Sequence, residues 1–591
     1  MSIPQVFTDE QKQYLQGFMT GALQRGVSTS NGQGGVPFAS GTGGVGAGTG
    51  MESGVGAETA EVFGTPAEDL CKEEQIKLEH NGLDIWDRIV ANADKGLFPE
   101  GGDNFRYKFH GLFYVAPAQD AFMIRLRTPA CQLSAQQFAG LGRAAELYGG
   151  GYSDITTRGN LQIREIKATD AARMLLHVDD LGLTSRGSGA DNLRNITASP
   201  TCGFDPHEVY DTRPLAKALH HYILNHRDMY GLPRKFNVSF DNGGDISVVA
   251  DTNDIAFYPV RVLNDNGVEP GVYFRVQLGG ITGHLQFASD TGLLLRPEEC
   301  VPTAIAMIRV FIENGDRTNR KRARLKYLLD KWGVERFLEE SETKLGYKLK
   351  RFPLEDCEPR RKCIPHGWVG FHPQKQEGKF YLGVAIPVGR MQASQMKQLA
   401  KIAELYGSGD IRLTVWQNLI IPDIDESDRD AVTKAIREIG FDVEASSILG
   451  GIVACTGNQG CKYAGANTKG HALIIAHHLN KKFDLPHPIN IHLTGCAHSC
   501  AQHYCGDIGL MGIGVKRGDK TVEGYNIVLG GGVDDQQGIG RDFLKSVPFD
   551  EVNGTLEKLL AYYLDKREED ETFLDFTRRQ EMDTLIAAVE N

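Results

Sequence analysis

An internal repeat is the feature of this sequence that most constrains its fold. The segment "AELYGGGYSDITTRGNLQI" (Ala145 to Ile163) aligns without a gap with "AELYGSGDIRLTVWQNLII" (Ala403 to Ile421), 258 residues later. Ten of the nineteen positions are identical, which argues against chance similarity between unrelated helix–strand units. In each copy a helical pattern ends in Glu-Leu-Tyr-Gly and a strand pattern follows. The repeat therefore predicts a duplicated α/β unit.

A second pair of similar segments follows in the same order. "VYFRVQLGG" (Val272 to Gly280) resembles "GYNIVLGGG" (Gly524 to Gly532), and a long helical stretch comes after each. The chain thus reads as a smaller unit and a larger unit, followed by a second copy of each. A duplication of this kind creates a pseudo-twofold axis, and a large ligand commonly sits at such an interface.

The segment before the first copy has a different composition. Residues 9–24 fit a short amphipathic helix, and the Gly/Ser/Thr-rich stretch after them is typical of a flexible surface segment. A chain of 591 residues is too long for one core. We predict folded structure from about Asp84 and five parts along the chain. They are an N-terminal helix and glycine-rich extension (1–83), the first small unit (84–180), the first larger unit (181–355), the second small unit (356–446) and the second larger unit (447–591).

Composition and charge exclude several classes of protein. With 41% hydrophobic and 24% charged residues, the chain has the composition of an ordinary globular protein. It has no long apolar run and no basic-then-apolar start, so we expect a cytoplasmic protein without a membrane segment. The formal charge of −12 argues against a nucleic-acid partner, although it leaves room for a local basic pocket.

Two pairs of cysteines lie in loops that contain glycine and threonine. Cys455 and Cys461 are in "ACTGNQGC", and Cys496 and Cys500 are in "TGCAHSC". The helical stretch between the pairs can bring the two loops together. Four thiolates on two loops can bind a 4Fe–4S cluster, which takes a soft ligand at each iron.

Other roles for these cysteines stay open on spacing alone. A structural zinc site is an alternative, because His498, His503 and Cys505 lie close in sequence. A disulfide network fits the expected compartment poorly. Cys357 and Cys363 repeat the spacing of the first pair, but they stand in a charged, linker-like segment without a second pair nearby. We therefore expect no metal at that pair.

Basic side chains are concentrated in the first small and first larger units. The basic set comprises Arg125, Arg127, Arg158, Arg164, Arg194, Arg234, Lys235, Arg317, Arg320, Lys321, Arg322, Arg324 and Lys326, with the polar Gln162 and Asn237 among them. Strand alternation places Arg125 and Arg127 on one face, and Lys235 and Asn237 likewise on one face. In a net acidic protein, this concentration predicts a buried cationic pocket for a polyanion.

Taken together, these motifs resemble those of the sirohaem-dependent nitrite and sulfite reductases. The two cysteine pairs, the duplication and the segments "LPRKFN", "DNLRN", "DPHEVYDTRP" and "GDIGLMG" carry the resemblance, over roughly residues 100–580. It implies an α/β (α+β) fold around a pseudo-twofold axis. The small units (84–180 and 356–446) would be ferredoxin-like half-domains. The larger units (181–355 and 447–591) would bind sirohaem and the 4Fe–4S cluster.

The resemblance also implies roles for particular residues. It implies a 4Fe–4S cluster held by Cys455, Cys461, Cys496 and Cys500, with Cys500 bridging to the sirohaem iron. By position, the residues of the substrate-binding face are Arg125, Arg194, Lys235 and Asn237. Arg158, Gln162 and Arg164 fall in the segment that contacts the macrocycle and its carboxylates.

The function that the resemblance implies is the six-electron reduction of nitrite to ammonium. Reduction of sulfite to sulfide is the alternative, and Asn237 favours nitrite because sulfite enzymes tend to have lysine there. No Gly-x-Gly-x-x-Gly fingerprint follows a strand, so we expect a separate electron donor, most simply a ferredoxin. A zinc-stabilised polyanion-binding protein is an alternative of a different class. We expect a monomer, since the duplication already supplies the symmetry of a dimer.

One part of the second cysteine loop departs from the family pattern. Ala497 and His498 stand where family members commonly have Pro-Asn. Neither position supplies a cluster ligand in the family, so we expect the cluster to be kept. The departure leaves the hydrogen bonding of the cluster, and hence its potential, open.

Overall fold

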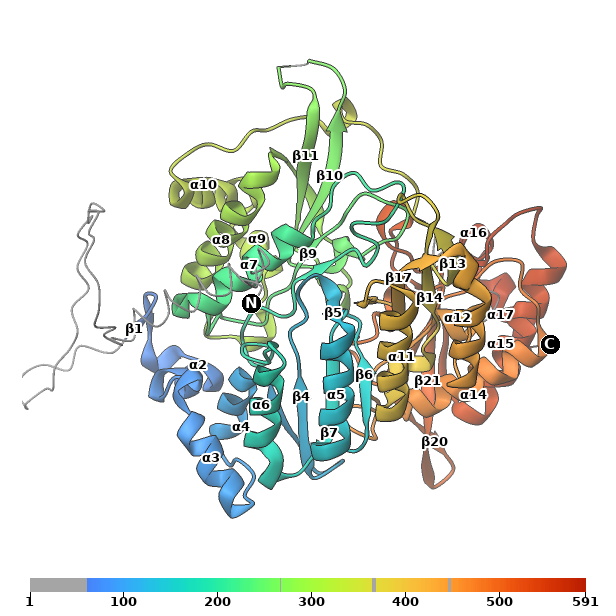
Figure 1. Cartoon of the computed structure of the whole chain (residues 1–591), viewed down its shortest axis with the longest axis horizontal. Coiled ribbons are helices and arrows are strands. Elements are labelled where there is room, and N and C mark those ends of the chain that lie inside the picture. Colours follow the sequence, from blue (N-terminus) through green and yellow to red (C-terminus); the bar gives the residue numbers. More distant parts are fainter. Residues whose placement is uncertain (1–60, 266, 364–367, 445–447, 591) are drawn as a thin grey trace, which may run out of the picture.

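The computed structural model describes residues 61–265, 267–363, 368–444 and 448–590. Within these ranges the chain is mixed α/β, with four five-stranded sheets and helices packed against them (Figure 1). The helix predicted over residues 9–24 and the glycine-rich stretch after it lie outside the described residues. No helix in the described ranges is long and apolar enough to cross a membrane.

The two small units contain antiparallel sheets that exchange one strand. The first sheet has the order β15-β6-β7-β4-β3, and the second has the order β13-β14-β17-β16-β5. Strand β15 (Arg390–Gln392) of the second copy pairs with β6 (Tyr152–Ile155) of the first. Strand β5 (Gln132–Ser134) of the first copy pairs with β16 (Asp410–Leu413) of the second. Each small unit therefore completes the sheet of the other.

The other strands of these two sheets follow the predicted repeat. They are β3 (Leu112–Val115), β4 (Ala121–Arg125) and β7 (Leu161–Ile166) in the first sheet, and β13 (Gly370–Pro373), β14 (Lys379–Val384) and β17 (Leu419–Asp425) in the second. Helix α5 (Ala135–Tyr148) ends before β6, as helix α11 (Ala393–Tyr406) ends before β16. The predicted helix–strand repeat is confirmed.

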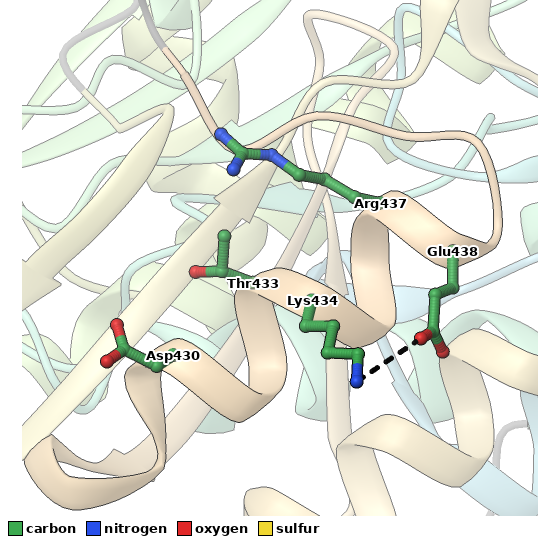
Figure 2. A pocket seen from close by; sticks show the side chains of 5 residues that line it. All are labelled: Asp430, Thr433, Lys434, Arg437 and Glu438. Atoms are coloured by element: carbon green, nitrogen blue, oxygen red, sulfur yellow. Dashed lines mark ion pairs between the residues drawn. The ribbon is translucent and has the colours of Figure 1, made fainter.

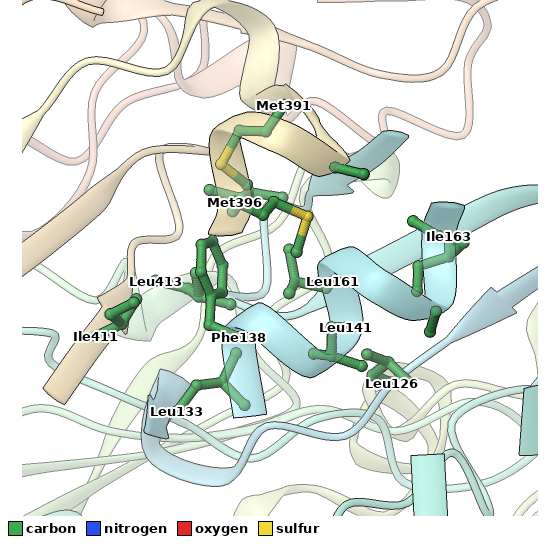
Figure 3. Close-up of a cluster of buried hydrophobic side chains, with 14 of the residues drawn as sticks. Leu126, Leu133, Phe138, Leu141, Leu161, Ile163, Met391, Met396, Ile411 and Leu413 are labelled. Carbon is green, nitrogen blue, oxygen red and sulfur yellow. The ribbon is translucent and has the colours of Figure 1, made fainter. Parts of the chain in front are cut away.

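Helices α5 and α11 lie side by side and join the two small units into one core (Figure 1). Both helices begin with a capping box, which satisfies the first free backbone N–H groups. A glycine at Gly142 permits the close approach, because a Cβ there would lie 3.1 Å from the backbone oxygen of Ala393. Figure 3 shows Phe138 and Leu141 of α5 packed with Met391 and Met396 of the second copy. Helices α6 (Ala171–Asp180) and α12 (Arg429–Glu438) pack beside α5 and α11 respectively.

The two larger units share a second topology. Their sheets have the orders β12-β11-β10-β9-β8 and β18-β19-β20-β21-β22, each with three parallel strands followed by two antiparallel ones. The strands are β8 (Thr197–Ala198), β9 (Val238–Phe240), β10 (Ile255–Val262), β11 (Gly271–Leu278) and β12 (Ser289–Leu295), then β18 (Ile452–Ala454), β19 (Ile491–Thr494), β20 (Ile508–Arg517), β21 (Lys520–Leu529) and β22 (Arg541–Pro548). The hairpins β10–β11 and β20–β21 project from opposite ends of the molecule (Figure 1).

The second predicted repeat is also confirmed. The similar segments form β11 and β21, and the long helices after them are α8 (Pro297–Asn314) and α15 (Phe549–Lys566). The remaining helices are α3 (Trp86–Lys95), α4 (Asp103–Arg106), α7 (Arg213–Asn225), α9 (Leu325–Trp332), α10 (Val334–Leu345), α13 (Ile448–Gly451), α14 (Thr468–Lys482), α16 (Phe573–Arg579) and α17 (Met582–Glu590).

Folded structure begins earlier than the predicted start at Asp84. Residues 61–83 contain a two-stranded ribbon, β1 (Glu61–Val62) with β2 (Thr65–Pro66), and helix α2 (Lys72–Glu79). Glu74 of α2 is buried and pairs with Arg317 at 2.7 Å. This ion pair, with Ile76 packed into the core of the first larger unit, explains why the segment is ordered. The expectation of a flexible extension up to residue 83 is wrong for residues 61–83.

Candidate functional site

The two cysteine loops leave neighbouring parallel strands at the same edge of a sheet. Cys455 follows β18, and Cys496 comes two residues after the end of β19. The backbone N–H of Gly465 donates to the carbonyl of Gly495 at 2.7 Å, and the N–H of Gly495 donates to Cys455 Sγ at 3.1 Å. A Cβ on Gly495 would lie 2.5 Å from that of Ala464, so a glycine is needed for the loops to meet.

The four predicted cysteines are brought together by these loops. Although Cys500 is partly accessible to solvent, burial of its surroundings raises the pKa of its thiol to about 11. Lys235 lowers this pKa, whereas Cys455, Cys496 and Cys461 raise it. Among the described residues no three His, Cys, Asp or Glu side chains form a site for a single metal ion. A 4Fe–4S cluster spreads its thiolates over four irons, which suits this arrangement better than one zinc ion.

The other cysteines make separate contacts. Cys357 Sγ contacts the carbonyl of Pro353 at 3.8 Å, and Cys363 Sγ contacts Asp534 Oδ2 at 3.8 Å. All eleven cysteines lie in the described ranges, and none forms a disulfide there. These contacts do not contradict the prediction that Cys357 and Cys363 bind no metal. They also do not contradict the expectation against a disulfide network.

Four cationic side chains from the first half cluster beside Cys500: Arg125, Arg158 and Lys235 interact with its thiol, and Arg194 interacts with Arg125 and Arg158. Arg125 ends β4, Arg158 lies in the β6–β7 turn, and Arg194 and Lys235 precede β8 and β9. Burial lowers the pKa of Arg125 and of Arg158 to about 10, and that of Lys235 to about 7. Burial also lowers the pKa of Arg194, and the nearby charges of Arg125 and Arg158 lower it further. The Cys500 thiol acts against burial and raises the pKa of Arg125, Arg158 and Lys235.

The nearby acids are already occupied by other cations. Asp254 forms a two-pronged pair with Arg324, at 3.0 and 2.7 Å. Asp191 pairs with Arg320 in the same two-pronged way. In the described part of the chain no ion pair compensates the four cations around Cys500, so the pocket carries a surplus of positive charge. Such a surplus is the electrostatic signature of a binding site for an anion.

Backbone and amide groups hold two of these cations in place. Arg194 donates to the carbonyls of Ser188 and Ala190 at 2.5 and 2.7 Å. Arg158 donates to Asn253 Oδ1 at 2.5 Å. Beside Arg158, the hydroxyl of Thr157 donates to the carbonyl of Cys500 at 3.0 Å. The β6–β7 turn of the first half is therefore bonded directly to the second cysteine loop.

The polar residues predicted with the arginines lie at two places. Asn237 is buried; its N–H donates to Asp254 Oδ2 at 2.8 Å, and its side-chain Oδ1 has no partner. Arg164 donates to Gln162 Oε1 at 2.9 Å and to Thr456 Oγ1 at 2.6 Å, and its Nη1 atom is buried without a partner. Arg164 thus contacts the first cysteine loop, because Thr456 directly follows Cys455, and Gln162 is linked to that loop through Arg164.

The predicted basic set is larger than the set that surrounds Cys500. Arg320 and Arg324 are in ion pairs within the first larger unit, and Arg317 pairs with Glu74 of α2. Arg127 is fully buried and donates to the carbonyl of Leu193 at 2.9 Å and to His220. These arginines hold the fold together, so the expectation of a single pocket for the whole set is wrong.

Asp154 is a functional neighbour that the sequence reasoning missed. Its carboxylate accepts from Arg390 at 2.8 Å and from Arg164 at 3.2 Å, and it lies 3.7 Å from Lys469. Burial raises its pKa, but Lys469, Arg390 and Arg164 outweigh burial and lower the pKa to about 2. A carboxylate inside a short strand pattern, "YSDI", was the signal that could have indicated it.

Two hollows of the surface do not coincide with this pocket. One of about 590 Å³ lies along α12 and is lined by Asp430, Thr433, Lys434, Arg437 and Glu438 (Figure 2). Lys434 and Glu438 form a pair there at 3.9 Å. A second, of about 430 Å³, includes Thr456 and Gln459 of the first cysteine loop and the basic residues Arg390 and Lys469.

Two family models match the chain. The model described as the nitrite and sulphite reductase 4Fe-4S domain matches residues 189–349 and 447–591. The model described as the nitrite/sulfite reductase ferredoxin-like half domain matches residues 116–179 and 372–439. The matches alternate along the chain in the order of the internal repeat.

Individual proteins are similar over most of their length. The chain is 36% identical to the ferredoxin–nitrite reductase of Synechococcus elongatus, over 83% of this chain and 96% of that protein. It is 36% identical to the chloroplastic ferredoxin–nitrite reductase of Zea mays, over 85% and 91%. Its fold matches the structure of the Mycobacterium tuberculosis NirA protein with a TM-score of 0.81 and 27% identity, over 87% of this chain and 97% of that one.

Proposed function

The chain belongs to the nitrite and sulphite reductase family of oxidoreductases, and we propose that it catalyses the six-electron reduction of nitrite to ammonium. Several similar proteins are named ferredoxin–nitrite reductase. The observation that carries the proposal is the surplus of cationic side chains around Cys500. The mechanism needs both an anion site and a metal centre, and this arrangement puts an anion-binding surface beside a cysteine loop.

We propose a 4Fe–4S cluster held by Cys455, Cys461, Cys496 and Cys500. Two observations support this proposal. The two cysteine loops meet at Gly495, and the other three thiols lie close enough to raise the pKa of Cys500. The donor set is all sulfur, which is the chemistry that iron–sulfur clusters select. The family name of the matched domain points to the same cofactor.

We propose sirohaem as the second cofactor, with Cys500 shared between the two centres. Sirohaem carries eight carboxylates, and the pocket offers cations without a compensating ion pair among the described residues. Arg158, Gln162 and Arg164 would hold the macrocycle and its carboxylates, and the unpartnered Nη1 atom of Arg164 is available for such a bond. When bound, the two cofactors supply one-electron transfer and an iron that accepts nitrite.

The chain's own residues would bind and protonate the substrate. Arg125, Arg194 and Lys235 would meet the negative charge of nitrite, with Asn237 as a neutral neighbour. Reduction to ammonium takes up six electrons and eight protons and releases two water molecules. The pKa of Lys235 is lowered to about 7, so its Nζ atom can give up and regain a proton near neutral pH. Lys235 is therefore the proposed proton donor.

We propose a ferredoxin as the electron donor, because similar proteins are named for it. Nitrite reduction by the purified protein should be supported by reduced ferredoxin under anaerobic conditions. A protein that accepts electrons only from a nicotinamide cofactor would contradict this proposal.

The decisive experiment compares nitrite and sulfite as substrates. Purified protein should contain iron and a haem-type absorption spectrum, and its kcat/KM with a reduced donor should be higher for nitrite. Replacement of the amide by a cation in Asn237→Lys should shift the preference toward the sulfite dianion. A colourless protein without iron would reject the reductase function, and a wild-type preference for sulfite would reverse the choice of substrate.

A further inference from the structure

The second cysteine loop contains a histidine whose ring faces one of the four proposed ligands. His498 Nδ1 lies 3.4 Å from Cys496 Sγ, within the range of a hydrogen bond to sulfur. The proposed reaction gives this ring no role. His498 is exposed at the surface, and its ring lies near Lys235 of the cationic pocket.

We propose that His498 donates a hydrogen bond from Nδ1–H to the Cys496 thiolate and thereby raises the reduction potential of the cluster. This inference rests on the proposed function, because it requires Cys496 to be a cluster ligand. A thiolate that binds iron carries no proton, so only the ring can be the donor. A donor to sulfur stabilises the reduced cluster more than the oxidised one, since reduction adds negative charge. His498 is therefore a positioning residue that tunes the cluster.

The neighbouring ligand shows why a side-chain donor matters here. Cys455 Sγ accepts a hydrogen bond from the backbone N–H of Gly495 at 3.1 Å, and the Thr468 hydroxyl, 3.6 Å from this sulfur, donates to the Cys455 carbonyl. Cys496 Sγ has a backbone hydrogen bond from His498, and the His498 ring adds a side-chain nitrogen at 3.4 Å. Among the described residues, His498 is the one side-chain nitrogen within hydrogen-bond distance of any of the four sulfurs. A substitution at His498 can therefore remove a donor without moving the backbone.

The surroundings of His498 hold the ring in this position. The ring of Tyr463 stands edge-on to it, with centroids 5.4 Å apart and planes at 79°. The backbone below is a tight turn, in which the N–H of Ser499 donates to the carbonyl of Cys496 at 3.1 Å. Gly283 of the first half lies against this turn, and a Cβ there would be 3.2 Å from the carbonyl of His498. Tyr463 therefore contacts the ring, while Gly283 of the first half contacts the backbone turn below it.

Two roles of the ring must be separated by experiment: donation of a hydrogen bond, and shielding of the cluster from water. His498→Phe keeps a ring for Tyr463 to contact and removes the donor. His498→Gln keeps a donor and removes the ring. Tyr463→Phe is the matched control, because it keeps the edge contact and does not touch Cys496. All three changes are at exposed positions, so the fold should be retained.

The test is a redox titration of the purified holoenzyme, in which the reduced cluster is followed by electron paramagnetic resonance. For His498→Phe we expect the reduction equilibrium to shift about tenfold toward the oxidised cluster, which is about 59 mV to lower potential for one electron. His498→Gln should lie closer to the wild type, and Tyr463→Phe should match it. An exchangeable proton coupled to the reduced cluster in pulsed measurements should disappear in deuterated buffer, and should be missing from His498→Phe.

The outcomes distinguish this inference from the proposed function. A potential of His498→Phe equal to that of the wild type would overturn the hydrogen bond, and so would His498→Gln with a potential as low as His498→Phe. In both cases a normal iron content would leave the proposed function intact. Wild-type protein without a cluster would instead reject the proposed function itself.

Discussion

The two larger units share a hydrogen bond from a backbone N–H at an equivalent position. The accepting atom is a hydroxyl oxygen in the first unit and a sulfur in the second. In the first unit the N–H of Asn242 donates to Ser199 Oγ at 3.0 Å. In the second the N–H of Gly495 donates to Cys455 Sγ at 3.1 Å. Both acceptors directly follow a short strand and donate their own N–H groups to the next strand. The scaffold is therefore shared, and the exchange of serine for cysteine gives the second unit a thiol at this position, which we propose as a cluster ligand.

In the small units it is the first copy that carries the charged residues of the site, and the second copy lacks them at the equivalent positions. At the offset of 258 residues, Arg125 corresponds to Gly383, Arg158 to Trp416 and Arg164 to Pro422. The second copy has no room for an arginine at Gly383, because even a Cβ would lie 1.9 Å from the carbonyl of Trp368. The duplicated units therefore keep the same backbone but carry different side chains at equivalent positions. The first half supplies cations, the second half supplies thiols, and the two sets meet around Cys500.

A third pair of positions is nearly identical in both halves. Asn237 donates its N–H to Asp254 Oδ2 at 2.8 Å, and Asn490 donates to Asp507 Oδ2 at 2.8 Å. The Oδ1 atoms of both asparagines are buried without a partner. The difference lies in the acids. Asp254 is paired with Arg324, whereas burial raises the pKa of Asp507 to about 7.

The largest effect is expected when the second larger unit is made like the first. Cys455→Ser introduces the residue found at Ser199, with a similar acceptor for Gly495 but without the soft thiolate that iron requires. We expect loss of the cluster and of nitrite reduction. Iron content, the visible spectrum and turnover measure both losses.

A matched control for this change is Cys357→Ser, in the pair predicted to bind no metal. Its sulfur contacts a backbone carbonyl and packs in a hydrophobic cluster, so iron content and spectra should be unchanged. Loss of iron in Cys357→Ser together with full iron in Cys455→Ser would show that the wrong cysteines were chosen.

The next largest effect is expected from the ion network between the halves. Asp154→Asn removes the carboxylate shared by Arg390, Arg164 and Lys469, and leaves buried cations without compensation. We expect the free energy of unfolding to fall by about 3–5 kcal/mol. Denaturant unfolding measures the change.

The surface pair of Asp170 with Arg173 provides the control for this network. Arg173 is 71% exposed, so Asp170→Asn should change the free energy of unfolding by less than about 1 kcal/mol. Equal effects of Asp154→Asn and Asp170→Asn would mean that the network does not join the halves.

The contrast between Asp254 and Asp507 predicts a dependence of stability on pH. Because folding raises the pKa of Asp507 to about 7, its protonated form contributes stability at low pH, and this contribution is lost as the pH rises toward 7. Asp507→Asn mimics the protonated carboxyl. Relative to this variant, the wild type should lose about 2–3 kcal/mol of unfolding free energy between pH 5 and pH 8. Parallel pH profiles of the two proteins would contradict a raised pKa.

The smallest effect is expected from removal of one cation. Arg125→Gln makes the first small unit uncharged at this position, as the second copy is at Gly383. A hydrogen bond to a charged group contributes about 1.5–3 kcal/mol, so kcat/KM for nitrite should fall about 10- to 100-fold. Arg143→Gln, at an exposed position of α5, is the control and should leave kcat/KM unchanged. Similar losses in both variants would argue for a general effect of charge rather than for binding at Arg125.

Much of the fold could be predicted because the repeat is visible in the sequence. The identities around Ala145 and Ala403 fixed the helix–strand units, and the "VYFRVQLGG" and "GYNIVLGGG" segments located the hairpins of the larger units. The order of residues 61–83 could not be predicted in the same way. It depends on the pairing of Glu74 with Arg317, 243 residues away, and neither residue has a local signal of this contact.

Only part of the site could be predicted, because the rest depends on contacts between distant residues. The arginines and lysines could be identified as a set, but their division into pocket and ion pairs depends on where acids such as Asp254 and Asp191 fold. Strand alternation gave the face of Arg125 but not the partner of Arg127, which lies beyond the end of β4. The bond from Thr157 to the Cys500 carbonyl joins residues 343 positions apart and has no pattern that a sequence could show.

The strand exchange between the small units has a consequence for synthesis of the chain. Strand β6 emerges from the ribosome long before β15, its partner in the sheet, because the paired residues Asp154 and Arg390 are 236 positions apart. The edge of β6 therefore stays unpaired while 236 further residues are synthesised. During that interval β15 of another copy could occupy it, which is the route to domain-swapped dimers. Such dimers are the misfolded product we expect when the chain is overproduced, and they should keep native sheets while failing to separate on dilution.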